Sequence, residues 1–277
     1  MRHLRKGLLR SPVIAVAGVV AVLAGAGVAG ATDWLPVFQT ERIAPVSVST
    51  AELVRLPDLT GFGELTVTEK PAVREVAGAT AAQTATGLTI PQVSALPKGV
   101  HGVPVYRAGG RASAEFTFSA AKTAQTLAAA GKSAPPAPAG LDGSRFRLVA
   151  GPGLAATWST SGTMPSLIVA RMVAPTAYAS GIPFVTARDY LLSLSLLPPE
   201  VAAQLRTFAG DGTTLPLPIS ADSMTSSSAD VGGIAATVVT ARDGVLSAVV
   251  WTDHGVVTAV AGSLSVDEVL AVARGLR

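Results

Sequence analysis

The chain has 277 residues, of which 49% are hydrophobic and only 14% are charged, and it contains neither cysteine nor asparagine. This composition excludes disorder of the whole chain, disulfides, thiolate metal sites, cysteine nucleophiles and N-glycosylation. The formal net charge of +3 arises at the N-terminus, because residues 1–31 hold four basic and no acidic side chains, whereas residues 32–277 hold one more acid than base. We therefore expect no nucleic-acid partner.

The first predicted element is a membrane-spanning helix. Residues 13–31 form an unbroken run of apolar and small side chains, and the uncharged stretch around it extends from Ser11 to Thr32. A helix rises about 1.5 Å per residue, so this stretch reaches roughly 30 Å, the thickness of the hydrocarbon core of a bilayer. The sequence therefore predicts a transmembrane helix over residues 12–32. The predicted membrane anchor includes Val13, Val16, Val20, Leu23 and, at the outer interface, Trp34.

The charges that flank this helix predict its orientation. All nearby basic residues precede it, and the first charged residue that follows it is Asp33. The positive-inside rule then places residues 1–11 in the cytoplasm and the rest of the chain outside, as a single-pass protein of the cell membrane. A tail of this length is too short for a folded cytoplasmic domain. The residues that set this topology are Arg2, Arg5, Lys6 and Arg10.

The alternative to a retained anchor is a cleaved signal peptide, because Ala29-Gly30-Ala31 resembles a cleavage site. Two observations favour the retained anchor. The apolar run is longer than the usual core of a signal peptide, and Trp34-Leu35-Pro36 continues the apolar character beyond the cleavage site. Both alternatives export the remaining chain.

The exported part is interpreted as a juxtamembrane linker over residues 33–60, which is punctuated by prolines, and one domain over residues 61–277. A Pro- and Gly-rich loop at 132–143 is expected to be mobile. Before this loop we expect a turn at 96–99, strands at 61–68, 103–107 and 113–119, and helices at 74–86 and 119–130. After it we expect strands at 145–149, 155–160 and 166–173, then helices at 186–194 and 199–208.

The C-terminal end has the clearest pattern. Tight turns at 242–244 and 253–255 separate apolar runs, which predicts strands over 231–240, 245–251 and 256–261. Ser265 and Glu268 then form a capping box at the start of a helix with one apolar stripe. The predicted fold class is therefore α+β, with an extracytoplasmic antiparallel sheet packed against several helices.

The closing segment, residues 249–276, also carries a family resemblance. It contains a strand with a tryptophan, a glycine turn, a strand that ends in glycine and a Ser-x-x-Glu helix start, at Trp251, Gly255, Gly262, Ser265 and Glu268. Together with similar segments at 88–91, 96–99, 188–192 and 214–218, it resembles a domain-of-unknown-function family of actinobacterial, Gram-positive membrane proteins. The extracytoplasmic domain of that family is shared with some anti-sigma factors. The resemblance implies an outside partner or sensor role and no particular functional residue, because the matching motifs are structural.

No catalytic, cofactor-binding or metal-ligating residue is predicted. Ser119 and Lys122 fit the S-x-x-K motif of penicillin-recognising enzymes, but the companion motifs are missing, so we interpret them as a helix N-cap and a solvated lysine. His101 and His254 lie in a predicted loop and turn and lack partners at catalytic or metal spacing. Trp158 and Trp251 are expected in the sheet core, with the lining of a ligand groove as the alternative.

These observations predict a membrane-anchored extracytoplasmic domain that binds an envelope or membrane protein, or senses an envelope signal, without enzymatic activity. The alternative is a carrier or receptor for a hydrophobic or lipid ligand, which the aliphatic composition permits. An extracytoplasmic hydrolase is a third hypothesis, and it requires a cleft that brings Ser119, Lys122 or an exported histidine beside a carboxylate.

Overall fold

The computed structural model describes residues 34–49, 59–159, 164–194, 199–208 and 212–277. The predicted cytoplasmic tail and the transmembrane helix over residues 12–32 lie outside these ranges. Within them, no helix has both the length and the apolar character needed to cross a bilayer.

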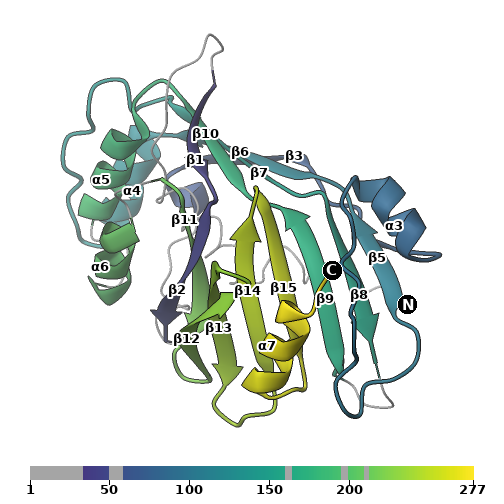
Figure 1. Ribbon diagram of the computed structural model, residues 1–277. Helices are drawn as coiled ribbons and strands as arrows, with labels where there is room; N and C mark the ends of the chain where they lie inside the picture. The colour runs from purple at the N-terminus through teal and green to yellow at the C-terminus, as the bar shows by residue number, and fades with distance from the viewer. Residues whose placement is uncertain (1–33, 50–58, 160–163, 195–198, 209–211) are drawn as a thin grey trace, which may run out of the picture.

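The described chain is α+β, as the sequence predicts, and it contains more antiparallel sheet than helix (Figure 1). A five-stranded sheet has the order β1-β10-β7-β6-β3. Its strands are β1 (Leu35–Gln39), β10 (Thr176–Ser180), β7 (Arg145–Ala150), β6 (Ala112–Phe118) and β3 (Gly63–Glu69). An eight-stranded sheet has the order β12-β13-β14-β15-β9-β8-β5-β4. Its strands are β12 (Met224–Val231), β13 (Ile234–Ala241), β14 (Ser247–Asp253), β15 (Val256–Gly262), β9 (Leu167–Val173), β8 (Gly153–Trp158), β5 (Val105–Gly109) and β4 (Arg74–Val76).

The two sheets are continuous with each other through four chain segments. β3 leads into β4, β5 into β6, β7 into β8 and β9 into β10, and the four partners keep the same neighbours in both sheets. A short break separates the members of each pair, and the breaks contain Pro71, Gly110, Gly151-Pro152 and Pro175. Proline lacks the N–H that a ladder requires and glycine tolerates a sharp bend, so these residues interrupt pairing at the same level in four adjacent strands. The result is one large sheet bent along a crease.

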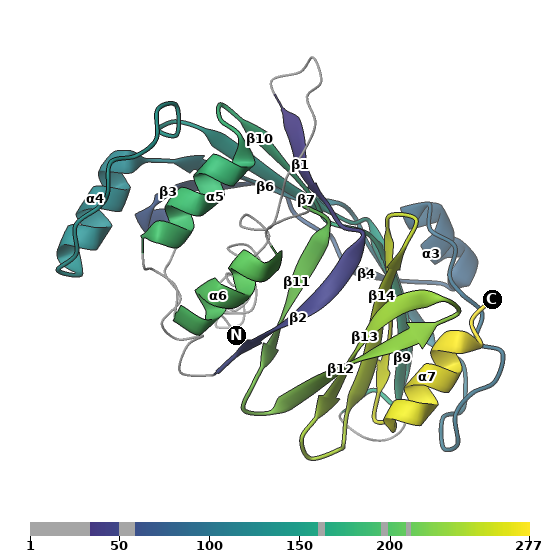
Figure 2. The same cartoon turned by 60° about the vertical axis from the view of Figure 1, so that its left-hand side comes forward.

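In the described part of the chain, helices pack on this bent sheet in two groups (Figure 2). α4 (Ala120–Ala129) and α5 (Phe184–Ser193) cover the five-stranded sheet through a cluster that includes Phe116, Phe118, Leu127 and Tyr190. On the other side of the molecule, α3 (Ala79–Thr86) and α7 (Val266–Arg274) cover one face of the eight-stranded sheet. Trp158 and Trp251 are buried in that second cluster, which confirms their predicted place in the sheet core.

The linker predicted over residues 33–60 is partly wrong. Residues 35–39 form β1, and residues 42–48 form β2 (Arg42–Val48), which pairs in parallel with β11 (Thr214–Ser220). Val46 and Val48 are fully buried against α6 (Pro199–Phe208). The prolines are the reason for the wrong prediction. They are tolerated in β1 and β2 because each of these strands has a described pairing partner on one side only.

Most of the remaining elements agree with the prediction, with a few differences. The helix predicted from residue 74 begins at Ala79, because residues 74–76 pair with β5 and Gly78 separates them from the helix. The strands β10, β11 and β12 are not predicted. The capping box of Ser265 and Glu268 is present. The 132–143 segment has no helix or strand, but its Leu141 is fully buried beside α4 and α5.

Candidate functional site: an apolar sheet face

The eight-stranded sheet has two faces of different coverage. On β8, β9 and β15 the residues that alternate toward α3 and α7 are buried, among them Ala156, Val169 and Val260. The register places these three residues side by side, so they form one continuous layer beneath the helices. This is the covered face, and its packing accounts for the stability of this half of the sheet.

The opposite face is the candidate site, and we call it the apolar face. Its central row, read across four strands, is Arg107, Ala155, Ala170 and Ala259. The complete face on β5, β8, β9 and β15 consists of Val105, Arg107, Gly109, Gly153, Ala155, Thr157, Ile168, Ala170, Met172, Val257, Ala259 and Ala261. All of these residues are partly or fully exposed, and none belongs to a buried cluster.

One end of this side of the sheet is covered by β2. The Thr237 hydroxyl on β13 donates a hydrogen bond to the Ile43 carbonyl on β2, at 2.9 Å, and Thr237 and Val239 are each only 5% exposed. β2 also contacts β14. The side chains farther along, on β15, β9, β8 and β5, keep their partial exposure in the described part of the chain. The coverage therefore stops partway across the sheet.

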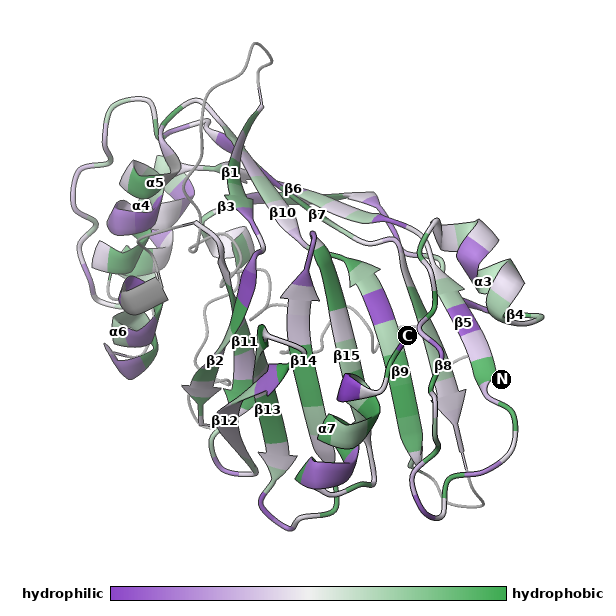
Figure 3. Ribbon diagram, in the orientation of Figure 1, coloured by the Kyte–Doolittle hydropathy of each residue, from purple (hydrophilic) through white to green (hydrophobic). Residues whose placement is uncertain are grey.

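The composition of the apolar face differs from that of an ordinary solvent-facing sheet. An antiparallel sheet with one face in water alternates apolar and polar residues along each strand. β8, β9 and β15 contribute no charged side chain to this face, and Arg107 lies at the edge, on β5. Figure 3 shows the apolar positions that run along β9 and β15. Exposure of so many adjacent aliphatic groups costs free energy unless something covers them.

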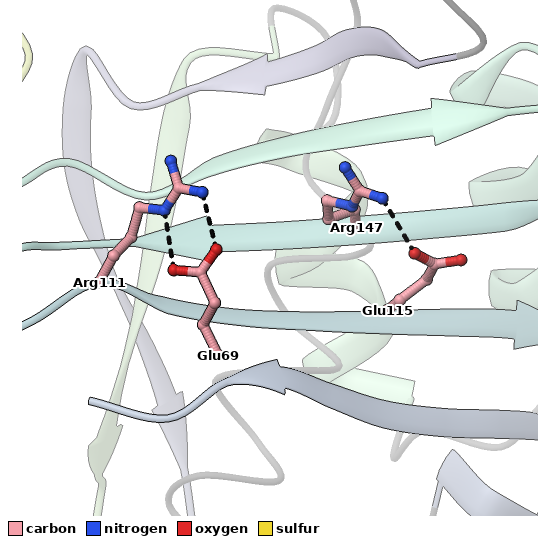
Figure 4. A network of polar contacts seen from close by, with 4 residues as sticks. All are labelled: Glu69, Arg111, Glu115 and Arg147. Carbon is pink, nitrogen blue, oxygen red and sulfur yellow. Dashed lines mark hydrogen bonds and ion pairs between the residues drawn. The ribbon is translucent and has the colours of Figure 1, made fainter. Parts of the chain in front are cut away.

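The outer face of the five-stranded sheet provides the contrast, and we call it the polar face. Arg111 makes two hydrogen bonds to Glu69, at 3.1 and 2.7 Å, and Arg147 makes one to Glu115, at 3.2 Å (Figure 4). The hydrogen bond from Arg111 lowers the pKa of the Glu69 carboxyl, and the positive charges of Arg111 and Arg147 lower it further. This face has the charged side chains expected of a surface in water.

Trp34 lies on the polar face. Its ring is stacked by the guanidinium groups of Arg145 and Arg147, whose central carbons lie 4.9 and 4.1 Å from the ring centroid. Trp34 is the one predicted anchor residue within the described ranges. Val13, Val16, Val20 and Leu23 lie outside them, as do the topology residues Arg2, Arg5, Lys6 and Arg10.

The structure places the candidate catalytic residues of the sequence at a helix cap, against a backbone carbonyl or on the exposed surface. Ser119 caps α4, with its side-chain oxygen accepting from the Lys122 backbone N–H at 3.3 Å. The Lys122 ammonium donates to the Gly63 carbonyl at 3.0 Å, so it is held by the backbone of β3. His254 lies in the β14–β15 turn with a 96% exposed side chain, and His101 is also exposed. Among the described residues, no group of three or more histidines and carboxylates could hold a metal ion.

The apolar face was missed by the sequence prediction, although a signal for it exists. The segments GLAATW, LIVARMV and VVTAVAG are almost continuously apolar, which is typical of strands with both faces covered. Searches with this chain against protein-family models, curated proteins and solved structures found no match. The surface chemistry of the chain is therefore the basis for its proposed function.

Proposed function

We propose that this chain is a non-enzymatic, membrane-anchored domain on the extracytoplasmic side of the cell membrane, and that its apolar face holds an aliphatic ligand such as a lipid acyl chain. The observation that carries the proposal is a set of partly exposed aliphatic residues that spans β5, β8, β9 and β15 without a charged side chain except Arg107. The predicted anchor over residues 12–32 supports a location where such lipids are abundant.

The residue types favour an acyl chain over a protein partner. Protein interfaces draw most of their binding energy from tryptophan, tyrosine and arginine, and they are depleted in alanine. The central row of the apolar face is instead formed by Ala155, Ala170 and Ala259, with no aromatic residue. An acyl chain needs only dispersion contacts and removal from water, which contributes about 0.8 kcal/mol per buried methylene.

A photoactivatable long-chain fatty acid tests this proposal in membranes that contain the full chain. Crosslinking should label peptides from β9 and β15, mapped by mass spectrometry. Ala170→Asp places a short charged group at the centre of the face and should abolish the labelling, because a carboxylate cannot be buried beneath an acyl chain at low cost. Ala259→Asp serves as a second variant of the same kind.

The matched control is Ser227→Asp, on the exposed edge strand β12. It introduces the same carboxylate away from the apolar face, so the photoactivatable fatty acid should label this variant as strongly as the unmodified chain. Circular dichroism establishes that each variant is folded. Equal labelling of the unmodified chain and both folded alanine variants would contradict the proposal.

A protein partner remains the second candidate, and the edge strand β3 favours it. Leu65 and Val67 are 43% and 42% exposed, although they lie on the same side of the sheet as the buried Phe116. β3 pairs with β6 alone among the described strands, and an extended peptide could add to such an edge through backbone hydrogen bonds. Photo-crosslinking from position 65 in membranes should capture a specific protein if this candidate is correct, and capture of none would exclude it.

A further inference from the structure

We propose that the polar face of the five-stranded sheet lies in the headgroup layer of the bilayer, where Arg145 and Arg147 bind lipid phosphate beside Trp34. This inference rests on the anchored topology of the proposed function. It is independent of the ligand on the apolar face. It assigns an anion-binding role to the polar face.

The position of Trp34 relative to the sheet is fixed by its neighbours. The next residue, Leu35, begins β1 and pairs with Ala179 on β10. The ring itself lies against the two arginines of β7, at 4.9 and 4.1 Å. Arginine side chains stack favourably on a tryptophan ring, so Trp34 belongs to the folded domain and does not extend freely from it.

The sequence limits the distance between Trp34 and the bilayer core. The uncharged run ends at Thr32, and two residues of extended chain span at most about 7 Å. Each headgroup layer is roughly 5–7 Å thick. If residues 12–32 cross the bilayer, Trp34 therefore lies within or just above the headgroups. The guanidinium groups that stack on its ring then lie in the same layer.

The charges beside Trp34 suit lipid phosphate. Arg145 and Arg147 share one carboxylate, that of Glu115, at 3.7 and 3.2 Å, so these three groups together carry one net positive charge. The two arginine side chains are 42% and 36% exposed, whereas that of Glu115 is 19% exposed, so the cations lie toward the outside. Each guanidinium carries five N–H donors and forms strong paired hydrogen bonds to phosphate.

Arg111, on the same face, is different. It already makes a bidentate pair with Glu69, so its charge is balanced within a local ion pair (Figure 4). The proposed phosphate site is therefore confined to Arg145 and Arg147. In this orientation β1 and β2 lead away from the bilayer, and the β13–β14 turn with Arg242 lies at the far end of the eight-stranded sheet (Figure 1).

Tryptophan fluorescence tests this placement with the full chain in vesicles. Trp158 and Trp251 are buried in the core, at 8% and 7% exposure, so a quencher in the lipid reports mainly on Trp34. Phosphatidylglycerol whose acyl chains are brominated close to the glycerol should strongly quench the fluorescence of Trp34 in the unmodified chain. The quenching should disappear in Trp34→Phe, which leaves the two buried tryptophans in place.

Two further variants test the arginines. The double variant Arg145→Gln and Arg147→Gln should lose the excess of this quenching over that by equally brominated phosphatidylcholine, because each arginine near an anionic surface contributes roughly a fivefold preference for it. Arg242→Gln removes a charge far from the proposed site and should be quenched like the unmodified chain. Circular dichroism verifies folding of all variants.

Resistance to alkaline carbonate, measured on the same vesicles, separates failure of the inference from failure of the anchor. A chain that resists extraction but shows no quenching of Trp34 would overturn the phosphate site and leave the anchor intact. A chain that carbonate releases would overturn the anchored topology, and the inference with it. Equal quenching of the double variant and the unmodified chain would overturn the role of the arginines.

Discussion

Gly262 shows how a single residue sets the packing of two strands. It ends β15 opposite Ser247, and the backbone of Ser166 and Leu167 passes directly over its α-carbon. A β-carbon at this position would lie inside the contact distance of the Ser166 carbonyl oxygen. A glycine at the end of β15 thus has a physical cause, which is the close approach of the start of β9.

Gly262→Ala should therefore destabilise the domain by about 1–3 kcal/mol, because the clashing neighbour is backbone and cannot rotate away. The matched control is Gly110→Ala at the crease, where the backbone φ is not positive and a β-carbon would meet no atom within 4 Å. Urea unfolding followed by circular dichroism measures both. Equal midpoints for the two variants would contradict the argument.

The capping box at the start of α7 couples stability to pH. The Ser265 N–H and hydroxyl both donate to the Glu268 carboxylate, at 2.9 Å, and these hydrogen bonds lower the pKa of Glu268. A carboxyl with a lowered folded-state pKa contributes stability that is present above its unfolded pKa and is lost as the pH falls through the folded value. The contribution of the cap should accordingly weaken in acid.

Ser265→Ala should cost about 1 kcal/mol of unfolding free energy at neutral pH. The difference from the unmodified chain should narrow in acid, as the pH falls through the lowered pKa of Glu268 and its carboxylate becomes protonated. Urea titrations at neutral and at acid pH measure this difference. A difference that stays constant or grows in acid would exclude the proposed role of the carboxylate.

At the scale of elements, the sequence predicts the strands and helices in which apolar residues recur at a regular spacing. β13, β14, β15 and α7 follow from the Asp-Gly and His-Gly turns and from Ser265, because turn and cap residues mark the ends of apolar runs. The prolines of β1 and β2 predict a linker, and the local pattern around β4 predicts a helix. These strands are held by pairing with distant segments, which a local pattern does not contain.

The candidate site could be predicted only in part, for the same reason. The continuous apolar character of β9 and β15 indicates that both of their faces meet apolar groups. It does not reveal that β2 crosses β13 and β14 and leaves the neighbouring strands uncovered. That boundary depends on the parallel pairing of β2 with β11, which joins residues far apart in the chain.

The 132–143 segment illustrates an element that composition describes incompletely. It has no helix or strand, as its prolines and glycines predict, but Leu141 is fully buried and the Tyr190 hydroxyl donates to the Pro135 carbonyl at 3.0 Å. Burial also raises the pKa of Tyr190. The segment thus contributes to the core beneath the five-stranded sheet.

Leu141→Ala should destabilise the domain by about 2–5 kcal/mol, the usual range for truncation of a fully buried leucine. Pro136→Ala, an exposed position in the same segment, should have little effect. Thermal unfolding of the two variants compares them under the same conditions. A small loss of thermal stability in both variants would mean that this segment does not contribute to the core.

At the scale of the whole molecule, the bend in the sheet separates two surfaces of opposite character. The five-stranded half carries Trp34 and its arginines on an outer face rich in ion pairs, whereas the eight-stranded half carries the apolar face. If the chain enters the domain from the bilayer at Trp34, a single continuous sheet connects the membrane surface to the proposed ligand surface. This arrangement suits a domain that holds a lipid acyl chain near the membrane that supplies it.

Native mass spectrometry of the full chain, released gently from its membranes, tests the central claim most directly. Lipids that surround the anchor should be carried equally by the unmodified chain and by Ala170→Asp, because residues 12–32 are the same in both. The account predicts an additional acyl lipid on the unmodified chain and on Ser227→Asp, and its loss from Ala170→Asp. Identical lipid masses on all three folded proteins would contradict a ligand on the apolar face.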